Sequence, residues 1–179
     1  MVINTAPISA RDIRQQCRSG VFSQPTAGLC PSEAQANLLI LPSKYASDFR
    51  NFCQRNPVCC PLLGESPAPG DPSFPRFLAE DGTAADIRTD APKYHVYING
   101  KLENVVRDIV DEWDADSVAF FIGCSFSFED ALAKAGLAPR HLETGTTVSM
   151  YRTKLPLNPA GGAIFFPFFH PFGLPPWHI

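Results

Sequence analysis

The chain has 179 residues, of which 45% are hydrophobic and 18% charged, and its formal net charge at pH 7 is −3. This length suits one domain with its own core, and the apolar content excludes a disordered chain. The sequence contains no dense Lys/Arg run, which argues against a nucleic-acid partner bound through a basic face.

The first residues, MVINTAPISARDIRQQC, lack the apolar stretch of a secretory signal, and Asp12 makes them a poor mitochondrial presequence. We therefore expect a cytoplasmic protein without a membrane partner, with the mitochondrial matrix as the alternative. Six cysteines without a CxxC pair are then expected to be reduced thiols. Cys53, Cys59 and Cys60 have no histidine near them in sequence, so the spacing argues against structural zinc.

The N-terminal region predicts a helix that begins after Ser9 and ends at Gly20. Ser9 and Asp12 have the spacing of a capping box, and glycine is the residue that most often ends a helix. Arg14 and Arg18 lie four residues apart and would therefore be side by side. They are either part of a solvated surface, which sequence alone favours, or a pair that holds a carboxylate.

Two further helices are predicted between residues 32 and 57. Ser32 with Gln35 resembles a second capping box, followed by the apolar run Leu38–Leu41 and a stop at Pro42. A third helix is predicted from Ser43 to Asn56-Pro57, with its aromatic residues in the core. Residues 57–85 are rich in proline and glycine and are expected to form a long loop.

The second half of the chain is dominated by strand signals. Tyr94–Ile98 is typical of a strand, Asn99-Gly100 favours a type I′ hairpin turn, and residues 102–109 would form the return strand. Ser117–Ile122 is a short apolar run typical of a buried strand. Thr146–Thr153 alternates weakly and predicts another strand.

The stretch GCSFS, residues 123–127, lies between that buried strand and a predicted helix capped by Ser127 with Asp130. A helix N-terminus presents unpaired N–H groups and a partial positive charge, so it can bind an anion and lower the pKa of a nearby thiol. Cys124, Ser125 and Ser127 are therefore candidate site residues. The alternative is that they only cap and pack. The stretch is not a G-x-S-x-G elbow, because the second glycine is absent.

The segment DIRTD, residues 86–90, is the second candidate site. Arg88 could clamp a substrate carboxylate with two parallel hydrogen bonds. The alternative is an Asp–Arg pair on the surface, which contributes little. His95 and His141 are isolated histidines, and we expect them to be structural.

Several stretches together are similar to the D-glutamate cyclase family, in order and with compatible spacing, from about Ser9 to about Asn158. They are RSGVFSQPTAGL, AQANLLILP, DFRNFCQRNPVCCPLL, DIRTDAPKYHVYINGKL, VAFFIGCSFSFEDAL and VSMYRT. The resemblance implies an α/β fold with a mixed sheet, flanking helices and a smaller α+β lobe. It also implies a lyase of D-amino acid metabolism, a hydro-lyase that reversibly dehydrates D-glutamate to 5-oxo-D-proline without a known cofactor. Many bacterial members are labelled hydro-lyases without a demonstrated substrate.

Chemistry suggests roles for residues in these stretches. We expect Arg88 to anchor the substrate carboxylate, together with Arg18 or Arg152, and Cys124–Ser127 to form a cradle that includes Ser125 and Ser127. Asp90 or Glu129 would act as acid or base. Cys124 is also a candidate nucleophile, although no histidine partner can be assigned to it.

The end of the chain departs from the family. Members continue with S-M-R-P-like and H-G-A-P-V-H-like segments, whereas this sequence ends in GGAIFFPFFHPFGLPPWHI. We therefore expect a partial, truncated domain over residues 1–160 and a divergent, disordered tail over residues 161–179. The expected function is a D-glutamate cyclase-like lyase whose expected partners are a small carboxylate substrate and further copies of the chain in a homo-oligomer. The alternative is a carboxylate-binding or regulatory module without turnover.

Overall fold

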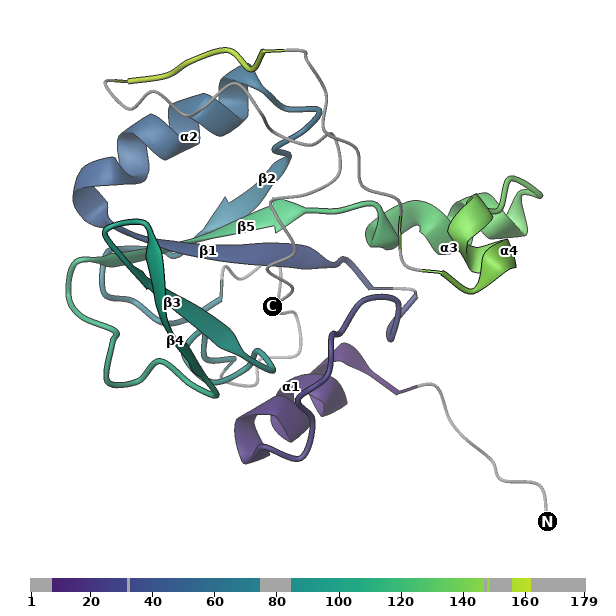
Figure 1. Ribbon diagram of the computed structural model, residues 1–179, viewed down its shortest axis with the longest axis horizontal. Coiled ribbons are helices and arrows are strands. Elements are labelled where there is room, and N and C mark those ends of the chain that lie inside the picture. Colours follow the sequence, from purple (N-terminus) through teal and green to yellow (C-terminus); the bar gives the residue numbers. More distant parts are fainter. Residues whose placement is uncertain (1–7, 32, 75–84, 147, 149–155, 162–179) are drawn as a thin grey trace.

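The computed structural model describes residues 8–31, 33–74, 85–146, 148 and 156–161. Figure 1 shows α2 on one side of a central sheet, α1 and a hairpin on the other, and α3 and α4 projecting beyond the end of β5. In chain order, the elements are α1 (Ala10–Ser19), β1 (Ala36–Pro42), the 3-10 helix η1 (Ser43–Tyr45), α2 (Ala46–Arg55), β2 (Leu62–Glu65), β3 (Tyr94–Ile98), β4 (Lys101–Val106), β5 (Ser117–Gly123), α3 (Phe126–Lys134) and α4 (Arg140–Thr144).

The central sheet has the strand order β1-β5-β2, and both of its strand pairs are antiparallel. The predicted strand β5 is confirmed, and it is buried on both faces because its residues are apolar at successive positions. Phe120 packs toward α2 with Phe49, and their ring centroids lie 4.9 Å apart. Phe121 packs on the opposite face with Ile87 and Phe74. The sheet therefore separates two layers of core.

The prediction of a helix over the run Leu38–Leu41 is wrong, because this run lies in strand β1. Leu39 and Leu41 pack on the α2 side, whereas Leu38 and Ile40 pack on the other side. A strand places successive side chains on opposite faces, so this short run covers both core layers at once. A short apolar run is compatible with either a helix or a strand. Here the run forms a strand because it pairs with β5 over the whole length of both strands.

Helix α2 and its end agree with the sequence. A 3-10 turn from Ser43 leads into the helix, which ends at Arg55 with Asn56 as its C-terminal cap. Its apolar side buries Phe49, Phe52 and Cys53 against the sheet. The predicted loop over residues 57–85 is corrected by strand β2, which pairs with β5.

The predicted hairpin is confirmed. Asn99 and Gly100 have positive φ values of 50° and 77°, as a type I′ turn requires. The return strand β4 ends at Val106 rather than at residue 109. Beyond it, the main-chain N–H of Ile109 donates to the Arg88 carbonyl at 3.0 Å, so the chain leaves the hairpin to join the DIRTD loop.

Helix α1 has the predicted capping box, in which Ser9 and Asp12 bond each other's backbone and side chain. It ends at Gly20, whose left-handed φ of 75° closes the helix. Its buried side packs Ile13 and Cys17 against Cys30. The helix therefore carries its arginines on sides that this cluster does not use.

Helices and strands are combined as the resemblance implies. Both sheets of the described residues are antiparallel, however, so these residues contain none of the parallel pairs of a mixed sheet. The strand predicted over Thr146–Thr153 lies almost wholly outside the described residues, and so does the tail from residue 162. The proposed boundary near residue 160 stays a prediction. No helix of the described residues is long and apolar enough to cross a membrane.

Candidate functional site

Asp90 is the centre of the first polar cluster. Its side chain is 1% exposed and receives two hydrogen bonds from Arg18, from Nε at 2.7 Å and from Nη2 at 2.8 Å. The main-chain N–H of Asp86 donates to it at 3.0 Å and the Thr89 hydroxyl at 3.1 Å. Arg14 lies 4.0 Å away. Arg18, with Arg14 beside it, therefore does hold a carboxylate, and this carboxylate belongs to the protein itself.

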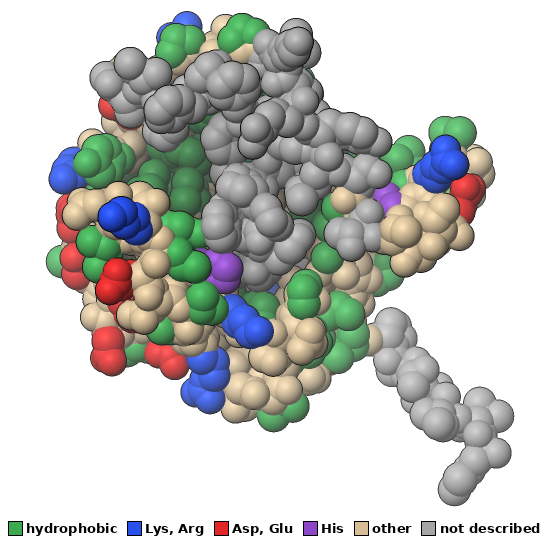
Figure 2. Space-filling view, viewed as in Figure 1, with side chains coloured by type: hydrophobic (Ala, Val, Ile, Leu, Met, Phe, Trp, Pro, Cys, Tyr) green, Lys and Arg blue, Asp and Glu red, His purple; other side chains and the backbone are tan. Residues whose placement is uncertain are grey.

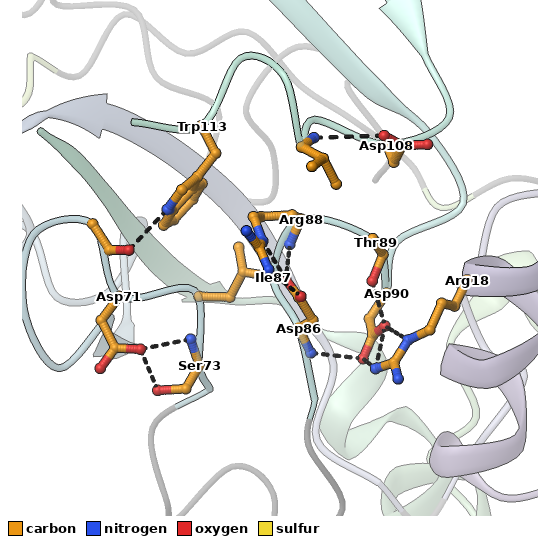
Figure 3. Close-up of polar contacts among 12 residues, drawn as sticks. Arg18, Asp71, Ser73, Asp86, Ile87, Arg88, Thr89, Asp90, Asp108 and Trp113 are labelled. Carbon is orange, nitrogen blue, oxygen red and sulfur yellow. Dashed lines mark hydrogen bonds and ion pairs between the residues drawn. The ribbon is translucent and has the colours of Figure 1, made fainter. Parts of the chain in front are cut away.

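This geometry affects two predicted roles, that of Asp90 as an acid or base and that of Arg18 as an anchor of the substrate carboxylate. A carboxylate that accepts from an arginine, a main-chain amide and a hydroxyl is held in place by donors on both oxygens. Figure 3 shows Arg18 reaching from its helix to Asp90 in the DIRTD loop. The arrangement favours a structural role, in which the pair fixes the loop to α1.

Arg88 forms a second pair in the same loop. Its Nε and Nη2 donate to the two carboxylate oxygens of Asp86 at 2.9 and 2.7 Å (Figure 3). Burial alone would raise the pKa of Asp86, but the hydrogen bonds and charge of Arg88 outweigh it and lower that pKa. Both side chains remain partly exposed. The geometry therefore matches the alternative considered for Arg88, an Asp–Arg pair near the surface, and the loop that carries the pair is partly exposed to solvent.

The N-terminus of α3 forms the second cluster. Ser127 does not cap the helix as predicted. Its hydroxyl accepts from the Gln35 main-chain N–H at 2.9 Å and donates to the Gln35 carbonyl at 3.1 Å. The side-chain amide of Gln35 bonds Thr26 and Gly28, so Gln35 does not serve a capping box either. Ser127 therefore joins α3 to the segment that leads into β1.

The main chain at this N-terminus is partly engaged. The N–H of Ser127 contacts the Cys124 carbonyl at 3.4 Å, and the N–H groups of Phe128 and Glu129 reach the Ser125 carbonyl at 3.0 and 3.2 Å. These bonds within the first turn leave fewer donors for an anion than an open helix N-terminus has. The predicted cradle therefore has few main-chain donors left in this turn.

Cys124 is held as a thiol. Burial raises its pKa, the Glu129 charge adds to that effect, and main-chain hydrogen bonds from Phe126 and Ser127 oppose it. Its Sγ donates to the Gln35 carbonyl at 3.6 Å. Because the thiolate is the nucleophilic form, a raised pKa weighs against Cys124 as a nucleophile.

Glu129 is the one carboxylate of this cluster, and the protein buries it. One of its oxygens accepts from the Ser125 hydroxyl at 2.7 Å, and the other lies 2.9 Å from Nε2 of His141. The Glu129 side chain is 6% exposed and that of His141 10%. Glu129 also lies in the first turn of α3, where the helix dipole favours a negative charge. A hydroxyl, a carboxylate and an imidazole thus form one continuous chain of polar contacts.

The structure therefore divides the predicted site residues into two groups. Arg18, Arg88 and Asp90 lie around the DIRTD loop, whereas Cys124, Ser125, Ser127 and Glu129 lie at the start of α3. No hydrogen bond or ion pair between described residues joins the two groups. Arg152 lies outside the described residues. No group of three or more metal-binding side chains occurs within the described part of the chain.

His141 is the site residue that sequence reasoning missed. It follows Glu129 by twelve positions, and no spacing rule connects two such residues across a helix end. Gly136 has a left-handed φ of 78°, which lets the chain reverse after α3. Helix α4, between Pro139 and Gly145, then brings the imidazole back to α3. The sequence therefore offers no local signal that connects His141 with Glu129.

The lobe formed by α3 and α4 also presents apolar side chains to solvent. Phe128, Leu137 and Leu142 are each about half exposed or more. Figure 2 shows hydrophobic side chains on this lobe and over the β3–β4 hairpin, between polar ones. Phe128 of α3 therefore lies outside the core, and the residue that α3 buries is Glu129.

Comparison with known proteins gives two further findings. Residues 118–165, which include α3, α4 and all of β5 but its first residue, match the D-glutamate cyclase family. A Burkholderia ambifaria protein named "Putative hydro-lyase" is 53% identical over 152 residues, which are 84% of this chain and 56% of that protein. A Bordetella pertussis protein with the same designation is 49% identical over 161 residues, 90% of this chain and 56% of its own.

These findings confirm the resemblance to the D-glutamate cyclase family that the sequence motifs indicate. The chain spans a little over half the length of the curated relatives it matches. The family match covers the cluster around Glu129, from Cys124 to His141.

Proposed function

We propose that this chain, a relative of the D-glutamate cyclase family, acts as a hydro-lyase on a small amino-acid carboxylate. The proposed reaction is the reversible dehydration of D-glutamate to 5-oxo-D-proline. The observation that supports it best is Glu129, a buried carboxylate held between a hydroxyl and an imidazole within the family segment.

The reaction needs groups that move protons. The α-ammonium group loses a proton so that the amine can attack the γ-carboxyl carbon, and the departing oxygen gains protons to leave as water. In the proposal, Glu129 accepts and returns these protons. Ser125, whose hydroxyl already donates to Glu129, passes protons between Glu129 and the substrate.

Arg88 is the proposed anchor of the substrate α-carboxylate. Its pair with Asp86 holds the guanidinium in one orientation, and a guanidinium has five N–H donors, of which this pair uses two. Arg152, which lies outside the described residues, is kept as a second proposed anchor. Arg18 is the weakest of the three, because Asp90 already accepts two of its N–H groups.

The test is to incubate the protein with D-glutamate and to follow 5-oxo-D-proline by chiral chromatography, with the reverse reaction run in parallel. We expect product, and we expect Glu129→Gln to lower the rate by about 10²–10⁴-fold, as loss of a general acid–base group does. Asp130→Asn is the matched control, because Asp130 is the next residue of α3 and pairs with Lys134 on the surface. Its rate should match that of the wild type.

Binding separates the lyase from its alternative. Thermal stabilisation by D-glutamate without any product would overturn the lyase in favour of a carboxylate-binding module. Absence of both product and stabilisation would overturn both. For the anchor, Arg88→Ala should abolish stabilisation by D-glutamate, whereas Arg50→Ala, which removes an equivalent Arg–carboxylate pair between α2 and β2, should retain it. Unchanged binding in Arg88→Ala would remove Arg88 as the anchor.

A further inference from the structure

We propose that His141 is the proton partner of Glu129, so that the two side chains act as one acid–base pair. This inference rests on the function proposed above. It goes beyond that function by adding a residue that no sequence motif indicates and by assigning it a defined role toward Glu129.

The geometry of the pair is specific. Nε2 of His141 lies 2.9 Å from one Glu129 oxygen while Ser125 occupies the other, so the carboxylate is contacted at both ends. Both side chains are at least nine-tenths buried, which strengthens their interaction relative to a pair in water. The Phe126 ring meets the imidazole edge to face, with centroids 6.4 Å apart, and restricts its orientation.

Few charged or titratable groups of the described residues surround the pair. Before α3 lies the Cys124 thiol, whose pKa burial and the Glu129 charge raise, so it stays neutral. On α3 itself, Asp130 and Lys134 pair with each other toward solvent. On α4 the charged residues Arg140 and Glu143 are exposed. Among the described residues, Glu129 is therefore the charged group that His141 contacts inside the lobe.

The proposed reaction shows why two titratable groups are useful. The substrate enters with an NH₃⁺ group and leaves with one amide N–H, so nitrogen gives up two protons. One C–N bond forms, one C–O bond breaks, and the leaving oxygen takes both protons and departs as water. A single carboxylate holds one proton at a time. A Glu–His pair can hold the second proton on the imidazole until the C–O bond breaks, and the net charge of the pair is then restored.

His141 acts through Glu129 and is therefore a positioning residue that also stores a proton. Its predicted effect is on the chemical step more than on binding. His141→Gln keeps an N–H donor near Glu129 but cannot hold a proton at neutral pH. We expect kcat for D-glutamate to fall by on the order of 10²-fold with KM within about twofold. We also expect the variant to change the shape of the wild-type pH–rate profile, because one titratable group of the pair is removed.

His95→Gln is the matched control, because His95 lies in β3 on the hairpin and not in the α3–α4 lobe. It should leave kcat and the pH profile unchanged. A His141→Gln variant that keeps the wild-type kcat and pH profile would overturn the inference. A lower kcat with an unchanged shape of the pH profile would also overturn it, because loss of active enzyme through misfolding of the lobe lowers kcat without changing the pH dependence.

A measurement without turnover separates this inference from the proposed function. In the ¹⁵N NMR spectrum of the wild-type chain, the His141 ring nitrogens report which of them carries a proton. Glu129→Gln should change the Nε2 signal, whereas Asp130→Asn should not. A changed signal together with absent 5-oxoproline formation would overturn the function and keep the Glu129–His141 coupling. An unchanged signal would overturn the coupling whatever the activity.

Discussion

The side chain of Asn56 holds the main chain of Asn158, which lies 102 residues further along the sequence. Its amide nitrogen donates to the Asn158 carbonyl at 2.9 Å, and its amide oxygen accepts from the Asn158 N–H at 2.8 Å. The same amide nitrogen donates to the Phe52 carbonyl in the last turn of α2. One buried side chain thus caps a helix and docks a later segment, which carries Leu157 and Ala160 into the core beside α2.

This contact predicts a large effect of Asn56→Ala. The substitution leaves the buried Phe52 carbonyl, and the main-chain groups of Asn158 at a partly buried contact, without this partner. It should therefore lower the free energy of unfolding by roughly 1–3 kcal/mol. Urea denaturation followed by circular dichroism measures this change. Asn51→Ala, on an exposed position of the same helix, is the control and should have little effect. Equal stability of the two variants would show that the contact does not hold the segment.

The Arg18–Asp90 pair predicts a second stability effect. Arg18→Gln removes the two charged hydrogen bonds to a buried carboxylate and should destabilise the protein by roughly 1.5–3 kcal/mol. Arg11→Gln changes an exposed arginine of the same helix and serves as the control. If Asp90→Asn is added to Arg18→Gln, part of the loss should be recovered, because the uncompensated charge is gone. Strict additivity of the two changes would contradict the pairing.

Asp86 predicts a dependence of stability on pH. Its pKa is lowered in the folded protein, because the Arg88 hydrogen bonds outweigh burial. A lowered pKa contributes stability that is present above the unfolded value, near 3.9, and is lost as pH falls through the folded value. The stability difference between wild type and Asp86→Asn should therefore be constant from pH 7 to about 5 and shrink in more acidic solution. Denaturation curves at several pH values would detect this, and a difference that grows toward acid would refute it.

Three buried thiols are predicted to react slowly in the native protein. Burial raises the pKa of Cys17 and Cys53 to about 11 and that of Cys60 to about 12, so few thiolates exist at pH 8. Iodoacetamide labelling followed by mass spectrometry should find these positions largely unmodified in the native state. All should be modified in guanidinium chloride. Rapid native labelling at Cys53 or Cys60 would mean that the core beside α2 opens frequently.

The sequence by itself determined the elements whose signals are local. The Ser9–Asp12 capping box, the Asn99-Gly100 turn and the apolar strand β5 each depend on residues within a few positions of one another. The resemblance to the D-glutamate cyclase family could also be found from the sequence alone, because several long motifs occur in the same order. Glu129 was included among the candidate site residues for the same reason.

Only the tertiary structure decided the rest. The run Leu38–Leu41 became a strand because β5 pairs with it, and Ser127 bonds Gln35, 92 residues earlier, instead of capping its own helix. His141 meets Glu129 because the chain reverses after Gly136. A short apolar run can pack as a helix or as a strand, and a serine or a histidine can hydrogen-bond many different groups. Which of these interactions forms depends on contacts between residues that are far apart in sequence, and these contacts exist only in the folded chain.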